Sequence, residues 1–183
     1  MKKILITIVM AFICYTGFSQ SMFDKYEDLD NVSAVVVNSS MFRLLSNIDV
    51  EVDDPEAKDF MDIAQSLKNL KVFITEDKAV SADMMKTMQK YLKTNSLEEL
   101  MRVKDEGTNV KFYIKKGKDE DHVSELLMFV TGLKDAGVDI DVNGRNFETV
   151  LLSLTGDIDL NKIGSLTSKM NLPKELNKAG KKQ

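Results

Sequence analysis

The residues best suited to chemistry lie in the segment DIDVNG, residues 139–144. Asp139, Asp141 and Asn143 alternate as oxygen ligands ahead of a glycine, which is the pattern of the first half of a calcium loop. A complete loop needs a bidentate Glu at its twelfth position, where this chain has Val150. Asn143-Gly144 is also the favoured dipeptide of a tight hairpin turn. We therefore expect a hairpin here and no metal site, with Asp139, Asp141 and Asn143 as the candidate ligands if calcium does bind.

His122 is the only histidine, and it follows three acidic residues in a turn between two expected strands. A general base needs an orienting partner and a substrate pocket, and a zinc site needs nitrogen or sulfur ligands beyond one imidazole. We therefore interpret His122 as a solvated turn residue. The chain contains no G-x-S-x-G motif and no glycine-rich phosphate loop. The sequence predicts no catalytic residue and no cofactor, so we do not expect an enzyme.

The N-terminus has the three-part layout of a secretory signal peptide. Two lysines precede an apolar run over residues 4–13, and Gly17 and Ser19 supply the small side chains that signal peptidase needs. We expect cleavage before Gln20. The apolar run is shorter than the roughly 20 residues that cross a bilayer, so a permanent anchor is not expected. Cys14 follows Ile13, whereas a lipid-bearing cysteine follows a small residue, so lipid anchoring through Cys14 is not expected either.

Cleavage would leave an acidic chain without cysteine. The leader takes Cys14, Lys2 and Lys3 with it, so residues 20–183 carry 23 basic and 29 acidic side chains, a net charge of −6. An acidic surface repels phosphate backbones, so we expect no nucleic-acid partner. Without disulfides the domain must rely on an ordinary hydrophobic core. These features favour a periplasmic or extracellular protein with no membrane span after cleavage.

Helical patterns occupy the first half of the chain and its C-terminal end. Residues 60–70 repeat apolar side chains at helical spacing after Pro55, and Met84, Met85, Met88 and Leu92 form a stripe that we expect to face the core. Ser81 or a neighbour is expected to cap that second helix. A third pattern, with Leu160, Ile163, Leu166 and Met170, predicts a last amphipathic helix.

Strand patterns occupy residues 32–38, 71–75, 99–104, 110–115, 123–131 and 147–155, and short polar turns join the later ones. They predict an α+β fold in which an antiparallel sheet, a meander in its C-terminal half, carries amphipathic helices on one face. We expect a signal peptide over residues 1–19, an N-terminal arm over 20–31, a single domain over 32–172 and a basic, flexible tail over 173–183.

Several segments resemble a family of small exported bacterial proteins, domain of unknown function 4252. The resemblance covers nearly all of the chain after the leader, and its most specific parts are EELMRVK, residues 98–104, and LTGDIDL, residues 154–160. It implies an exported single domain. It carries no established activity and no catalytic residue.

The chain is long enough to form an ordinary hydrophobic core, yet it contains no recognisable group of catalytic residues. This combination favours a non-enzymatic exported domain that binds a protein partner or an envelope component. A second hypothesis is a carrier of a small apolar ligand, with Met84, Met85 and Met88 lining a pocket between helix and sheet. A third is a hydrolase that uses carboxylates. The first is the function we expect from the sequence.

Overall fold

The computed structural model describes residues 21–46, 55–105, 107–134 and 147–161. In chain order the elements are η1 (Asp24–Tyr26), β1 (Val32–Asn38), α2 (Ser39–Ser46), α3 (Pro55–Ser66), β2 (Leu67–Thr75), α4 (Lys78–Asn95), β3 (Glu98–Asp105), β4 (Thr108–Lys116), β5 (His122–Thr131) and β6 (Thr149–Asp159).

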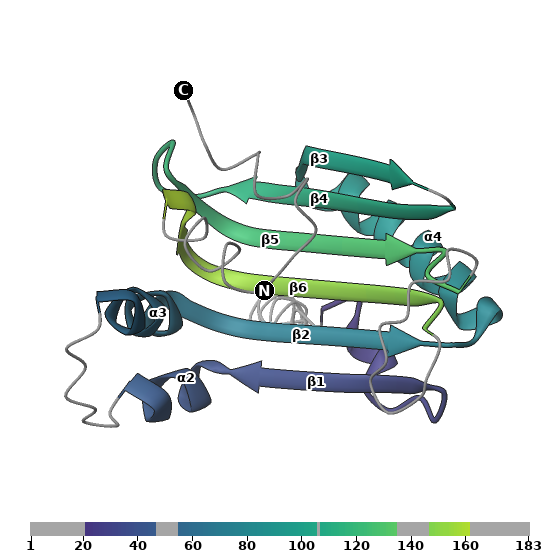
Figure 1. Cartoon of the computed structure of the whole chain (residues 1–183), viewed down its shortest axis with the longest axis horizontal. Coiled ribbons are helices and arrows are strands. Elements are labelled where there is room, and N and C mark those ends of the chain that lie inside the picture. The colour runs from purple at the N-terminus through teal and green to yellow at the C-terminus, as the bar shows by residue number, and fades with distance from the viewer. Residues whose placement is uncertain (1–20, 47–54, 106, 135–146, 162–183) are drawn as a thin grey trace, which may run out of the picture.

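The strands form one six-stranded sheet in the order β1-β2-β6-β5-β4-β3 (Figure 1). Every neighbouring pair is antiparallel. β6 lies between β2 and β5, so the last of the described strands joins the first two to the other three. The predicted α+β class with an antiparallel sheet is confirmed.

Two element boundaries differ from the prediction. Leu67 and Leu70 continue the helical spacing of α3, yet both belong to β2, because their apolar side chains also suit a strand paired on both sides. Residues 157–159 were expected to lead into the last helix, but they extend β6 and pair with β5. Most of that expected helix, including Ile163, Leu166 and Met170, lies outside the described residues.

One face of the sheet, which we term the helix face, is covered by α4 and by the N-terminal arm around η1. Figure 1 shows α4 behind the strands. The core on this side joins aromatic and aliphatic side chains of the sheet to α4 and to the arm. Its buried members are Phe23, Tyr26, Phe73, Met84, Met88, Tyr113, Leu127, Phe129 and Leu151.

Hydrogen bonds and ion pairs hold the arm and α4 in place on the helix face. The hydroxyl of Tyr26 donates to Asp83 at 2.7 Å and lies 2.8 Å from the hydroxyl of Thr87. The ammonium group of Lys71 binds both Asp24 and Glu27. These contacts join residues 21–27 to elements more than 40 positions later in the chain, so the expected N-terminal arm is part of the domain.

Asp77 caps α4, and Ser81 does not. The carboxylate of Asp77 accepts hydrogen bonds from the backbone N–H groups of Ala79 and Val80, at 2.7 and 3.1 Å. These bonds lower the pKa of Asp77. Ser81 lies one turn inside the helix and is buried, with its hydroxyl 2.6 Å from that of Thr149 in β6. The helix therefore begins earlier than predicted and places Ser81 against the sheet.

Gly156 lets β6 pass the junction of α3 and β2 at close range. A Cβ atom at this position would lie 2.9 Å from the Cα of Leu67 and closer still to the carbonyl oxygen of Ser66. Both are backbone atoms, which cannot rotate away. The glycine in the segment LTGDIDL is therefore explained by backbone approach.

We expect Gly156→Ala to lower the free energy of unfolding by about 1–3 kcal/mol, because overpacking against backbone forces the strands apart. Chemical denaturation followed by circular dichroism measures this. Asp157→Ala, at the exposed next position, is the matched control and should cost much less. Equal stability of the two variants would contradict the packing role of Gly156.

Candidate functional site

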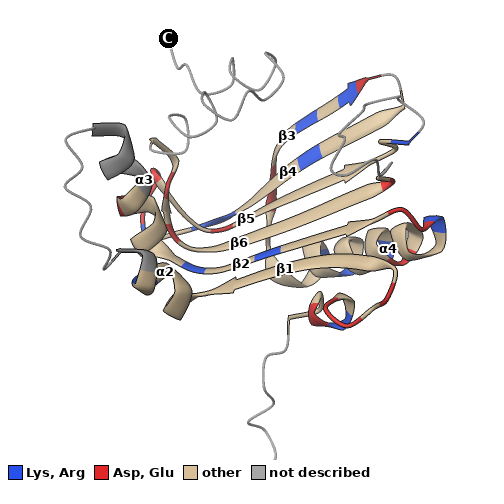
Figure 2. Ribbon diagram, turned by 60° about the horizontal axis from the view of Figure 1, so that its bottom comes forward, with Lys and Arg blue, Asp and Glu red and all other residues tan. Residues whose placement is uncertain are grey.

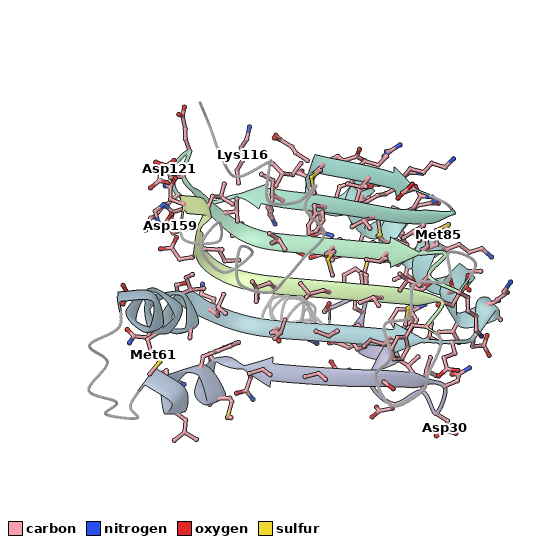
Figure 3. All side chains as sticks on the ribbon, in the orientation of Figure 1. Asp30, Met61, Met85, Lys116, Asp121 and Asp159 are labelled. Atoms are coloured by element: carbon pink, nitrogen blue, oxygen red, sulfur yellow. The ribbon has the colours of Figure 1, made fainter. Side chains whose placement is uncertain are left out.

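The sequence-based metal candidates Asp139, Asp141 and Asn143 lie outside the described residues. Within the described ranges, no group of three or more His, Cys, Asp or Glu side chains comes together in a way that could hold a metal ion. His122 lies at the start of β5, where its Nδ1 is 2.6 Å from Oδ1 of Asp119 in the same turn. That turn, with Asp121 beside it, lies at one end of the sheet (Figure 3).

The methionines of α4 are divided between the core and the surface. Met84 and Met88 are buried in the core of the helix face, whereas Met85 is exposed (Figure 3). None of the three lines either of the two cavities described below. Met84 and Met88 therefore act as core residues, as their helical spacing predicts.

The opposite side of the sheet, which we term the open face, carries three transverse rows of side chains. The strand registers align one residue from each of the six strands in every row. The middle row is wholly apolar and consists of Val35, Val72, Leu152, Met128, Phe112 and Met101. The row nearer α2 and α3 consists of Val37, Leu70, Leu154, Leu126, Ile114 and Glu98. The third row consists of Ser33, Ile74, Val150, Val130, Val110 and Val103.

Sixteen of these eighteen side chains are apolar, yet only Val130 is buried. Rows two residues apart lie about 7 Å from one another, and six strands span about 24 Å, so the apolar area is continuous across the sheet. Both outer strands contribute to it, and Val35 on β1 is 53% exposed. A continuous apolar patch of this extent is typical of an interaction surface.

The two faces of the edge strand β3 differ in polarity. On the helix face the strand presents Glu99, Arg102 and Lys104, all exposed. On the open face the same strand presents Met101 and Val103. Glu98 and Asp105, at the two ends of the strand, place charges on the open face as well, so the apolar part of β3 on this face consists of Met101 and Val103.

Structural elements stand at both ends of the open face. Leu133 and Phe147 pack on Val130 and form a small second core at one end. α2 and α3 lie at the other end, where Phe42, Ile63 and Ala64 are buried. Figure 2 shows the curved sheet with α2 and α3 at one end and α4 beneath it. The middle row lies between these two ends.

A polar cavity of about 280 Å³ opens on the helix face, beside the C-terminal end of α4. Four separate segments line it: the N-terminal arm, β2, α4 and β6. Its lining residues are Ser21, Met22, Asn69, Lys71, Tyr91, Asn95, Ser153 and Thr155. On the helix face the strands thus carry apolar side chains in the core and polar side chains at this cavity.

Glu125 is a buried carboxyl group next to this cavity. It is paired across β5 and β6 with Thr155, it is only 4% exposed, and its Oε2 accepts a hydrogen bond from the Tyr91 hydroxyl at 2.9 Å. Its other oxygen, like Oδ1 of Asn69, is buried without a hydrogen-bond partner among the described residues. Two buried acceptors that lack donors are unusual in a folded protein.

Burial dominates the electrostatics of this region. It raises the pKa of Glu125, and the Tyr91 hydrogen bond opposes that shift without cancelling it. Burial and then the neighbouring carboxylate raise the pKa of Tyr91 well above its usual range, so Tyr91 stays a hydrogen-bond donor. Burial would lower the pKa of Lys71, but its hydrogen bonds to Asp24 and Glu27 outweigh that effect and raise it.

A second cavity, of about 360 Å³, lies at the opposite end of the strands. Asp77 and Asn31 line it, and they already hydrogen-bond to one another at 3.0 Å. None of its lining residues has a buried polar atom without a partner. Of the two cavities, the one beside Tyr91 therefore has the more evident capacity to bind a polar molecule.

Neither the open face nor the polar cavity was recognised from the sequence. Signals for both are present: residues 126–130 of β5 and 150–152 of β6 are apolar at consecutive positions, which indicates strands buried on both sides. Glu125 shares its alternation phase with Leu127 and Phe129, so strand periodicity places a carboxyl group on a buried face.

The structure is thus an α+β domain built on one antiparallel sheet. The chain belongs to the family described as Domain of unknown function (DUF4252), which matches residues 26–166. This confirms the resemblance of the sequence motifs. No curated protein and no solved structure matches the chain.

The stability of the domain should fall as pH rises, through Glu125. Because the folded-state pKa of Glu125 is above its unfolded value, the protonated form stabilises the fold below the unfolded pKa of about 4.3, and this stability is lost as pH rises through the folded pKa. We expect Glu125→Gln to be more stable than the wild type at pH 7.5 and to gain less on acidification to pH 5.

Thermal unfolding followed by circular dichroism across this pH range tests that expectation. Glu120→Gln, in the exposed turn before β5, is the matched control and should keep the wild-type profile. Parallel pH profiles for wild type and Glu125→Gln would show that burial does not shift the pKa of this group.

Proposed function

We propose that this chain is an exported, non-enzymatic binding domain that docks a protein partner on its open face. The observation that carries the proposal is the middle row of six apolar side chains. The row runs from one edge strand to the other, and none of its six side chains is buried. Leaving such a row in water is costly, at about 25 cal/mol for each Å² of apolar surface. A partner that covers the row recovers this free energy.

The helix face supports this proposal by comparison. There the apolar side chains of the sheet are covered by α4 through Met84, Met88 and their neighbours. The open face has the same strand spacing and similar apolarity, so an amphipathic helix suits it equally well. In this proposal the helical cover of the sheet is one-sided, strands β3 to β6 form a meander, and the partner supplies the missing layer.

The export signal in the sequence supports a partner outside the cytoplasm, in the periplasm, the envelope or the medium. Within the described residues, no helix is long and apolar enough to span a membrane. An envelope protein that presents an apolar helical stripe is the partner class that fits both the leader and the open face.

The adjacent residues Val35 and Val36 allow a matched test of the docking surface. Both are exposed valines on β1, 53% and 46% respectively, but Val35 points to the open face and Val36 to the helix face. A photo-reactive amino acid at position 35 should form adducts in living cells with one distinct protein, whereas the same group at position 36 should not. Mass spectrometry identifies the adducts.

The partner so identified is then purified and its affinity measured. Val35→Lys should weaken binding about tenfold, because one buried valine contributes about 1.5 kcal/mol, and Val36→Lys should leave binding nearly unchanged. Equal adducts at both positions would contradict the proposal. So would adducts only with residues 162–183 of the same chain, with a second copy or with phospholipid.

Export has its own test. The protein recovered from the exported fraction should begin at Gln20, as measured by intact mass, and Ser19→Leu should block this cleavage because signal peptidase requires a small residue there. Cys14→Ser should be processed as the wild type is. Loss of membrane association in Cys14→Ser would instead indicate a lipoprotein.

A further inference from the structure

The polar cavity beside Tyr91 has features of a ligand site that the open face does not explain. It lies on the other side of the sheet, and residues from four segments converge on it. At about 280 Å³ it is slightly smaller than the usual range for drug-sized ligands, so it suits a small molecule.

Hydrogen-bond acceptors without donors are the first clue to the ligand. Asn69 lines the cavity, and its Oδ1 is buried without a partner among the described residues. Glu125, next to the cavity through Tyr91 and Thr155, has a second such oxygen. Each buried acceptor left without a hydrogen bond costs about 1–3 kcal/mol, so a bound molecule with hydroxyl groups would supply the donor that Asn69, in the lining, lacks.

Hydroxyl groups of the protein are the second clue. Ser153 and Thr155 are successive residues on the helix face of β6, and both line the cavity. A protein hydroxyl can donate one hydrogen bond and accept two. The lining therefore offers donors as well as acceptors, which favours a ligand whose own groups can both donate and accept.

The charges around the cavity favour an uncharged ligand. Lys71 is the cation in the lining, and it is already bound to two carboxylates, Asp24 and Glu27. An anionic ligand would compete with these carboxylates for Lys71, and a cationic ligand would be repelled by its ammonium group. Neither sign of charge has an unengaged partner among the lining residues.

We propose that this cavity binds a neutral polyhydroxylated molecule of about the size of a monosaccharide. Asn69, Ser153, Thr155 and the hydroxyl of Tyr91 would hold the ligand hydroxyls by hydrogen bonds. The runner-up hypothesis from the sequence was an apolar ligand between helix and sheet. A cavity does lie at that junction, but its polar lining selects a different ligand chemistry.

Titration of the ¹⁵N-labelled protein with sugars tests this proposal. The probes are D-glucose, D-galactose, N-acetyl-D-glucosamine and myo-inositol, each added to roughly 50 mM to reach millimolar dissociation constants. At least one probe should cause saturable shifts of the side-chain amide signals of Asn69 and Asn95. Acetate and spermidine, as charged probes, should not.

Two isosteric substitutions provide the matched comparison. Thr155→Val removes a hydroxyl from the lining, and Thr131→Val removes one from the C-terminal end of β5, outside it. Thr155→Val should weaken sugar binding about tenfold, the effect of losing one hydrogen bond at a buried site. Thr131→Val should bind as the wild type does.

Three outcomes would overturn the proposal: no saturable shift with any of the four probes, equal affinities for Thr155→Val and Thr131→Val, or binding of a charged probe only. The first would mean that water fills the cavity. Because Val35 and the cavity lie on opposite faces, photo-crosslinking at position 35 is independent of these results, so this proposal and the docking proposal can fail separately.

Discussion

The rest of the structure depends on the pairing of β5 with β6 at the centre of the sheet. Every strand is linked through this pair: β6 also pairs with β2, and β5 also pairs with β4. Both strands carry apolar side chains on both faces. A strand of this kind needs a covering layer on each side, and this requirement shapes both surfaces of the domain.

On the helix face the requirement is met within the chain. α4 and the N-terminal arm bury Phe73, Leu127 and Leu151, and hydrogen bonds of Tyr26 with Asp83 and Thr87 join the arm to the helix. Towards the C-terminal end of α4 the same face becomes polar. Residues of the arm, the helix and two strands meet there around a cavity, with the buried carboxyl of Glu125 beside it.

On the open face the described residues cover the apolar side chains of the sheet only at the ends of the strands. Leu133 and Phe147 cover one end, and α2 and α3 lie at the other. Between these ends the middle row is apolar on all six strands, from Val35 to Met101. This continuous row is the physical reason to regard the open face as a docking surface.

Sequence periodicity predicted most of the secondary structure but not all of its boundaries. The region around Leu67 and Leu70 fits both a helix and a strand. Apolar residues three or four positions apart are typical of an amphipathic helix, and a short, largely apolar segment is typical of a buried strand. Only the pairing of β2 with β1 and β6 decided between them. The cap of α4 is a similar case: the sequence pattern places it at Ser81 or a neighbour, and the hydrogen bonds place it at Asp77, one turn earlier.

By itself, the sequence determined the α+β class, the antiparallel sheet, the family and the core role of Met84 and Met88, because each depends on local periodicity or on a continuous motif. The tertiary structure alone decided which residues meet across strands. The three apolar rows of the open face need the registers of all six strands, and the polar cavity needs residues from Ser21 to Thr155. Such sites arise from pairing between distant segments, which no local pattern records.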